Sequence, residues 1–276
     1  MKKHVVGSIE FFTYDSFSQQ EGVSCVTTTR AGGLSTGPFE SFNLGLRCED
    51  DKDTVIDNRA QLSLVTGAFP DLLTFGRQVH GAGVTVVTGE LIGSGALDAD
   101  SAIADTDGMV TDIADVPLVV LVADCAALSL YDPVKEVIGV AHAGWRGTVA
   151  GIAAVTVETM NEAFGTRPSD LIAGIGPSIG PCCYEVGGDV VGGLHDRHPD
   201  IAGRVITTDA HAAHLDLWTA NLLQLTAAGV REDRIEVAGL CTSCHRDVFY
   251  SHRAEDGRTG RFASLIMLHD KTHRSY

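Results

Sequence analysis

LVADCAALSLYDPVKEVIGVAHAGWRG, residues Leu121–Gly147, is the stretch that decides the fold. Two apolar runs flank Asp132-Pro133-Val134-Lys135, where proline at the second position is typical of a turn. The pattern predicts an antiparallel hairpin centred between Pro133 and Val134, with Cys125 directly opposite His142. Opposed residues have Cβ atoms about 4.5–5.5 Å apart. The two side chains would then be close enough to share a metal ion or to form a thiol–imidazole pair.

The composition is that of an ordinary globular protein. The chain has 276 residues, of which 44% are hydrophobic and 20% charged. Predicted strands outnumber helices and come in adjacent groups rather than in βαβ alternation, which favours an α+β fold. We see no repeat, linker or domain boundary. We therefore expect one domain over residues 1–276, with residues 1–20 as an N-terminal extension or edge segment.

Periodicity and turn residues predict the remaining elements. Helices are expected over 53–66, 148–164 and 216–228, and residues 89–106 are expected to form an exposed loop. Strands are expected over 22–29, 72–79, 84–88, 108–111, 118–122, 171–175, 235–238 and 262–268.

Charge and hydropathy exclude two classes of partner. The formal net charge is −16 and no basic run exceeds two residues, so binding to a nucleic-acid backbone is not expected. The longest apolar run, Val116–Ala123, is far shorter than the roughly 20 residues that span a bilayer.

Glu10 and Asp15 interrupt the N-terminal apolar segment, which disfavours a signal peptide. The seven cysteines are best interpreted as reduced thiols in a cytoplasmic protein.

Three side chains are candidates for a reactive centre. A single buried cysteine is usually a small hydrophobic residue. However, Cys125 and His142 both interrupt apolar strands that we expect to be paired. His80 also ends an apolar run and precedes a glycine. A Cys/His/His set would leave zinc one open position for water or substrate, although spacing alone leaves His80 only a candidate.

A second cysteine group invites other interpretations. Cys241-Thr-Ser-Cys244-His245 fits a c-type haem attachment motif, which the absence of an export signal disfavours. Cys241 and Cys244 could also form half of a structural zinc site. Cys182-Cys183 could supply the other half, but adjacent cysteines are poor co-ligands.

The remaining histidines and arginines fall into two groups. The pairs His195/His198 and His211/His214 lie in polar settings and are interpreted as solvated surface residues. No His-X-His sequence occurs, which argues against a multicopper centre. Glycine-rich segments at 30–33, 144–147 and 174–180 could direct N–H groups towards an anion. Arg30 and Arg146 lie in two of these segments and suit phosphate.

Several motifs together resemble those of the YfiH / laccase-domain family, and they run in family order from about residue 22 to 268. The matching pieces are Thr28-Thr29-Arg30-Ala31-Gly32-Gly33, Ser41-Phe42-Asn43-Leu44-Gly45, Asn58-Arg59, Gln78-Val79-His80-Gly81, Asp107-Gly108-Met109-Val110-Thr111, Ala123-Asp124-Cys125, Ala141-His142-Ala143-Gly144-Trp145-Arg146-Gly147, Gly176-Pro177 through Val186, and Thr259-Gly260-Arg261.

The resemblance implies a site, an activity and an architecture. His80, Cys125 and His142 would be the zinc ligands and catalytic centre. Four motif positions would lie around the site and bind substrate or phosphate, namely Arg30, Asn43, Gln78 and Arg146. The implied activity is phosphorolysis of adenosine, inosine and 5′-methylthioadenosine, with hydrolytic deamination of adenosine in addition. The implied fold has mixed β-sheets flanked by helices, similar to that of cysteine-dependent deamidating toxins.

Other functions stay open at this point. Cys125 could be a nucleophile with His142 as its base, in an amide hydrolase that edits peptidoglycan precursors. The chain could instead be a non-catalytic metal-binding protein, or a copper-dependent polyphenol oxidase as the older family name suggests. Copper is less favoured than zinc. The preferred nucleoside, the oligomeric state and the roles of loop 89–106, Cys241, Cys244 and His245 are not determined by the sequence.

Overall fold

The predicted hairpin forms the centre of the molecule. The computed structural model describes residues 1–209 and 212–270. Strands β8 (Ala126–Asp132) and β9 (Val137–Ala143) pair antiparallel, and both are buried along their whole length. Continuous apolar runs of this kind are typical of a strand that is covered on both faces.

The register of the hairpin differs from the predicted one by two residues. Asp132 pairs with Val137, and its Oδ1 accepts the N–H groups of Val134 and Lys135 at 2.8 and 3.1 Å. The loop is therefore longer than expected, and His142 lies opposite Ala127 rather than Cys125. Because side chains alternate along a strand, a shift of two residues leaves Cys125 and His142 on the same face.

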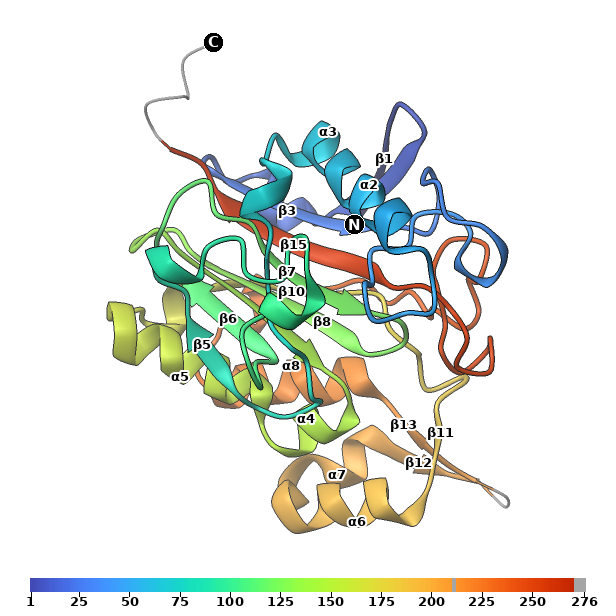
Figure 1. Ribbon diagram of the computed structural model, residues 1–276. Helices are drawn as coiled ribbons and strands as arrows, with labels where there is room; N and C mark the ends of the chain where they lie inside the picture. Colours follow the sequence, from blue (N-terminus) through green and yellow to red (C-terminus); the bar gives the residue numbers. More distant parts are fainter. Residues whose placement is uncertain (210–211, 271–276) are drawn as a thin grey trace.

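The strands form two six-stranded mixed sheets and one small sheet (Figure 1). In order, the first sheet contains β1 (Lys2–Val6), β2 (Ile9–Thr13), β3 (Val23–Thr28), β15 (Phe262–Leu268), β7 (Leu118–Val122) and β4 (Thr74–Phe75). The second contains β14 (Ile235–Val237), β10 (Ile172–Ile175), β8, β9, β6 (Gly108–Thr111) and β5 (Val84–Val86). The small sheet contains β11 (Glu185–Val186), β13 (Ala213–Leu215) and β12 (Ile206–Thr208).

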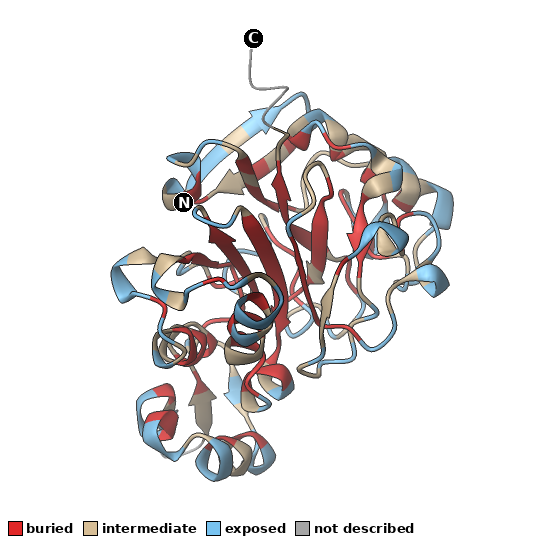
Figure 2. Cartoon of the chain, turned by 90° about the vertical axis from the view of Figure 1, so that its left-hand side faces the viewer, coloured by how far each residue is buried: buried red, intermediate tan, exposed pale blue. Residues whose placement is uncertain are grey.

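The two large sheets pack face to face. Val120 and Val122 of β7 share a buried cluster with Ile138 and Val140 of β9. The alternate residue of β7, Val119, packs on the opposite face of the first sheet. Figure 2 shows the resulting buried centre, with the central strands in red and most exposed segments at the periphery.

Helices cover the outer faces of the sheets. The helices are α1 (Asp15–Ser18), α2 (Lys52–Gln61), α3 (Ser63–Thr66), α4 (Trp145–Val149), α5 (Ile152–Phe164), α6 (Gly188–Arg197), α7 (Pro199–Val205) and α8 (Leu217–Ala227). Short 3₁₀ turns occupy Gly37–Phe39, Pro70–Leu72, Gly89–Leu91, Ala99–Ser101, Pro168–Asp170 and Glu232–Arg234. Helix α5 packs closely on β9, because a Cβ at Gly139 would lie 3.2 Å from the Met160 sulfur.

The α+β prediction with mixed sheets flanked by helices is confirmed, with local differences. The expected helix over 148–164 is interrupted at Gly151, which has a φ of +83°. The expected strand over 72–79 was too long, because only β4 is regular. Helices α6 and α7 were not predicted. Among the described residues, no helix is long and apolar enough to cross a membrane.

The surface interpretation of the four histidines is only partly correct. His195 is exposed. His198 is half-buried, with its Nε2 3.0 Å from the Val149 carbonyl oxygen, and His214 is also half-buried. His211 lies outside the described residues.

Truncation of a buried hairpin side chain should destabilise the fold. Ile138 is fully buried between the sheets, so Ile138→Ala removes buried methyl groups and should lower the free energy of unfolding by about 2–5 kcal/mol. Val134 at the hairpin turn is 67% exposed, so Val134→Ala should change stability by less than about 0.5 kcal/mol. Urea unfolding of the two variants measures the difference. Equal effects would contradict the packing described here.

Candidate metal centre and active site

The site lies where the chain passes twice between the two large sheets. Residues 76–83 connect β4 of the first sheet to β5 of the second, and residues 123–125 connect β7 of the first to β8 of the second. His80 lies in one connection and Cys125 in the other. The Gln78 side chain ties the first connection to β7, since its Nε2 donates to the Leu121 carbonyl and its Oε1 accepts the Leu121 N–H.

Three potential metal ligands converge at this point. One ligand atom from each of His80, Cys125 and His142 lies within 4.8 Å of the other two. The imidazole rings of His80 and His142 meet edge to face, with centroids 4.7 Å apart. His142 is buried at the end of β9, Cys125 is half-buried and His80 is exposed. The structure therefore brings together the three residues that sequence spacing alone could not group.

The buried carboxylate of Asp107 orients two of these residues. Its Oδ1 lies 2.8 Å from Nδ1 of His142 and accepts the N–H of His80 at 3.0 Å. Its Oδ2 accepts the N–H groups of Val79 and Gly81. These bonds hold His80 at a φ of +61°, and with Nδ1 of His142 bound to Asp107 they leave Nε2, on the Cys125 side, as the ring nitrogen that can bind a metal. Sequence reasoning missed Asp107, although it lies in a quoted motif.

A missing side chain makes room for the trio. Gly144 follows β9, and a Cβ at this position would lie 2.8 Å from the Cys125 sulfur and 3.2 Å from Cδ2 of His80. Any larger residue would displace one of these two side chains. Gly144 is a second site residue that sequence reasoning did not single out.

Electrostatics favour the ligand form of the cysteine. Burial by itself raises the pKa of Cys125, but the adjacent His142 and His80 outweigh it and lower the pKa to about 6. Burial likewise opposes the charge on His142, but Cys125 and Asp107 raise its pKa to about 9. The thiolate of Cys125 and the protonated ring of His142 thus stabilise each other. A metal ion binding here would displace the imidazolium proton.

The three side chains open into a cavity of about 600 Å³. Its lining is positively charged, with six arginines and Asp124 as the one carboxylate among the described residues that line it. The arginines are Arg47, Arg59, Arg77, Arg146, Arg253 and Arg261. This local charge is opposite in sign to the net charge of the chain.

Most of these arginines are engaged with the protein itself. Arg47 and Arg77 pair with carboxylates. Arg59 donates to three backbone carbonyls, and Arg253 and Arg261 also donate to carbonyl groups. Within residues 1–209 and 212–270, Arg146 has neither an ion pair nor a hydrogen bond from its guanidinium, which lies over the Trp145 ring at 4.2 Å. Its donors face no competing partner.

The other predicted substrate residues lie in different places. Gln78 lines the cavity, although its amide binds the Leu121 backbone. Asn43 is fully buried, and its Oδ1 accepts the N–H groups of Gly45 and Arg261. Arg30 donates to Glu255 and to two backbone carbonyls, away from the residues that line the cavity.

The donor set suits zinc better than a copper cluster. One thiolate and two imidazoles are ligands that zinc accepts, and three protein ligands leave a position open. The described residues contain one further group of potential metal ligands, and it has no histidine. A multicopper centre needs more imidazoles than this site offers.

Removing the Asp107 carboxylate should weaken metal binding. In Asp107→Asn, an amide NH₂ replaces one of the two acceptor oxygens, so one of the hydrogen bonds to the ligand loop or His142 is lost. We expect zinc affinity to fall about 10- to 100-fold, measured by competition with a chelator of known affinity. Asp105→Asn is the matched control, because Asp105 is exposed and its side chain pairs with Arg77 rather than with the ligand loop or His142. Wild-type affinity in Asp107→Asn would contradict the orienting role.

Comparisons with known proteins place the chain in a family. A family model described as "Multi-copper polyphenol oxidoreductase laccase" matches residues 24–269. "Purine nucleoside phosphorylase YlmD" of Geobacillus stearothermophilus is 42% identical, over 87% of this chain and 88% of that protein. "Adenosine deaminase RL5" of an unknown prokaryotic organism is 33% identical, over 92% and 97%.

Solved structures agree with this placement. The crystal structure of YlmD from Geobacillus stearothermophilus superimposes with a TM-score of 0.91 at 38% identity, covering 97% of this chain and 98% of that one. The relatives carry the names of a phosphorylase and a deaminase, which confirms the prediction of an enzyme. The chain belongs to the YfiH/YlmD family, whose family model carries the laccase name.

Proposed function

We propose that this protein is a zinc-dependent purine nucleoside phosphorylase. It would convert adenosine, inosine or 5′-methylthioadenosine and phosphate into the free base and the corresponding ribose 1-phosphate. The carrying observation is the cavity, which joins a Cys/His/His ligand set to an arginine-rich lining. The names of the relatives support the same reaction.

The cavity has the chemistry that both substrates require. Its volume lies in the range of small-molecule sites. Tyr184 lines the cavity and would provide aromatic surface for a purine, and Arg146 would provide donors for phosphate. A nucleoside is neutral, so the acidic exterior does not repel it. Phosphate is repelled at long range and attracted once it is near the cavity.

Phosphorolysis is a displacement at the anomeric carbon. A phosphate oxygen forms a bond to C1′, the C1′–N9 bond breaks, and its electron pair leaves on the purine, which then takes up a proton. Arg146 would hold the phosphate, because its guanidinium has no competing partner among the described residues. The other arginines would give the cavity a positive electrostatic potential. Their own hydrogen bonds and ion pairs within the protein would hold their side chains in place.

The ligand set would add a Lewis acid at one end of this cavity. His80, Cys125 and His142 would hold Zn²⁺, and zinc in such a site polarises a substrate atom or lowers the pKa of water. Asp107 keeps His142 in the ring orientation that ligation needs. The ligand thiolate requires a reducing compartment, so the proposal places the enzyme in the cytoplasm.

Two other reactions use the same side chains. Hydrolytic deamination of adenosine is a second candidate, supported by the name of the deaminase relative. A cysteine hydrolase is another, supported by the lowered pKa of Cys125 beside His142. Stoichiometric alkylation of Cys125 together with amide hydrolysis, in protein that never carried zinc, would favour the hydrolase over both nucleoside reactions.

Two other outcomes would indicate a different function. Phenol oxidation proportional to bound copper would favour an oxidase. Bound zinc without turnover would favour a non-catalytic metal-binding protein.

A phosphate-dependence assay tests the proposal directly. Zinc-replete protein should release adenine from adenosine and hypoxanthine from inosine only when phosphate is present, with ribose 1-phosphate in equal amount. Removal of zinc should abolish this release, and added zinc should restore it. Inosine formed from adenosine without phosphate would identify the deaminase activity. Absence of ribose 1-phosphate with metal-replete protein would overturn the phosphorylase assignment.

Removal of the Arg146 guanidinium should weaken phosphate use. We expect Arg146→Ala to raise the KM for phosphate by about tenfold or more, since a charged hydrogen bond contributes about 1.5–3 kcal/mol, and to leave the KM for inosine nearly unchanged. Arg146→Lys should recover part of the loss. Arg167→Ala is the control, because Arg167 is exposed and outside the cavity lining. An unchanged phosphate KM in Arg146→Ala would exclude this role.

A further inference from the structure

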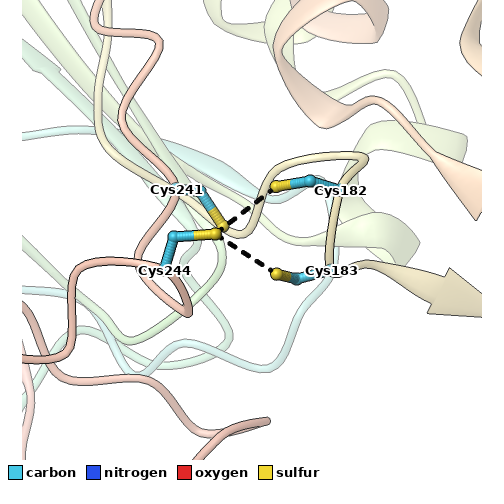
Figure 3. Close-up of side chains that lie close together, drawn as sticks. All are labelled: Cys182, Cys183, Cys241 and Cys244. Carbon is cyan, nitrogen blue, oxygen red and sulfur yellow. Dashed lines mark hydrogen bonds between the residues drawn. The ribbon is translucent and has the colours of Figure 1, made fainter.

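Four of the seven cysteines form a second cluster, which the proposed reaction does not use. Cys182 and Cys183 lie in the segment between β10 and β11, and Cys241 and Cys244 lie after β14. Figure 3 shows the four side chains pointing toward one another from these two segments. Their sulfur atoms all lie within 4.8 Å of one another. None of the cluster cysteines lines the cavity.

The sulfur separations match a tetrahedral metal site. The Cys244 sulfur lies 3.5 Å from that of Cys183 and 3.7 Å from that of Cys182. Four Zn–S bonds of about 2.3 Å in a tetrahedron place sulfur atoms about 3.8 Å apart. A disulfide bond is much shorter, at about 2.05 Å. An iron–sulfur cluster inserts several atoms between the thiolates and needs wider spacing.

Backbone contacts hold the two segments in this arrangement. Ser178 and Cys241 form a parallel bridge, and the N–H of Gly180 donates to the Cys241 sulfur at 3.2 Å. The N–H groups of Cys183 and Tyr184 both donate to the Gly180 carbonyl at 2.9 Å. This turn brings the side chains of two adjacent cysteines to one side. The objection that adjacent cysteines make poor co-ligands therefore does not hold here.

The chemistry of the four thiols points to a cation. Cys182 and Cys244 are exposed, and exposed free thiols in close contact are open to oxidation. A metal ion binds such thiols as thiolates, and its positive charge offsets the repulsion between them. An all-sulfur tetrahedral set selects zinc or iron, and a set of four protein ligands leaves no position open for substrate.

We propose that Cys182, Cys183, Cys241 and Cys244 bind one structural zinc ion. The site is distinct from the His80/Cys125/His142 centre, so the folded chain would carry two zinc ions. The ion would fasten the segment around Cys182 to the segment around Cys241.

The two segments that this zinc ion would hold together form part of the cavity wall. Ile179 and Tyr184 flank the first cysteine pair and both line the cavity. Thr242, next to Cys241, donates to the Asp124 carboxylate at 2.6 Å, and Asp124 precedes Cys125. A metal ion in the cluster would thus support this wall and the neighbouring ligand segment without contacting substrate.

Metal content of matched variants tests the proposal. Zinc-loaded wild-type protein should contain two equivalents by elemental analysis after gel filtration under reducing conditions. Cys182→Ser/Cys244→Ser and Cys125→Ser should each contain one equivalent, and the triple variant none. Cys48→Ser is the control, because Cys48 belongs to neither cluster, and it should retain two. One equivalent in the wild type, lost in Cys125→Ser, would overturn the second site.

Two further measurements leave the four cluster cysteines intact, and they apply if the double variant does not fold. Co²⁺-substituted protein should show the intense thiolate charge-transfer absorption of an S₄ site, and Cys125→Ser should retain it. Zinc should also protect the four cluster cysteines from alkylation until a chelator is added. Unprotected thiols, a Cys183–Cys244 disulfide in zinc-treated protein, or bound iron in place of zinc would each overturn the proposal. Because these readouts do not involve turnover, they stand or fall separately from the phosphorylase assignment.

Discussion

The geometry of the candidate site depends on one buried carboxylate, that of Asp107. It immediately precedes β6, accepts three consecutive backbone N–H groups around His80 and binds Nδ1 of His142. Burial raises its pKa, but the His142 ring and these N–H groups outweigh that effect and lower it. The carboxylate therefore stays ionised. It joins a loop that has no regular structure to a strand of the second sheet.

The change of sheet between β7 and β8 explains why reactive residues lie close together at the candidate site. Strands β7 and β8 belong to different sheets, so the chain must turn sharply between them, and Asp124 adopts a φ of +87° at this point. Thr242 and the N–H of Arg253 hold its carboxylate. Cys125 thus follows a fixed turn rather than a mobile loop. Placing ligands on such rigid segments limits the reorganisation that binding requires.

Local patterns predicted more of this structure than of its site. The apolar runs around Asp132 predicted the hairpin, but the side-chain bonds that lengthen its turn are not visible in a hydrophobic pattern, so the register was missed. His80 remained a candidate because its neighbours come from distant segments, which only the family resemblance connected. The segment 186–216 lacks strong periodicity, and α6 and α7 were missed there. The sequence suggests the four cysteines as two halves of a zinc site, but it does not reveal the turn at Gly180 that brings the adjacent Cys182 and Cys183 to one side.

The order of strands in the second sheet also bears on when the metal centre forms during folding. His80 and Cys125 lie in the two connections, and His142 lies on the second sheet. The three ligands become neighbours only after β5, β6, β9 and β8 have paired, because His80 precedes β5 and lies far along the chain from the hairpin that carries Cys125 and His142. Long-range contacts of this kind form slowly. An ion bound by all three would therefore stabilise the paired second sheet relative to every earlier state, and it would bind after this part of the fold has formed rather than start its formation.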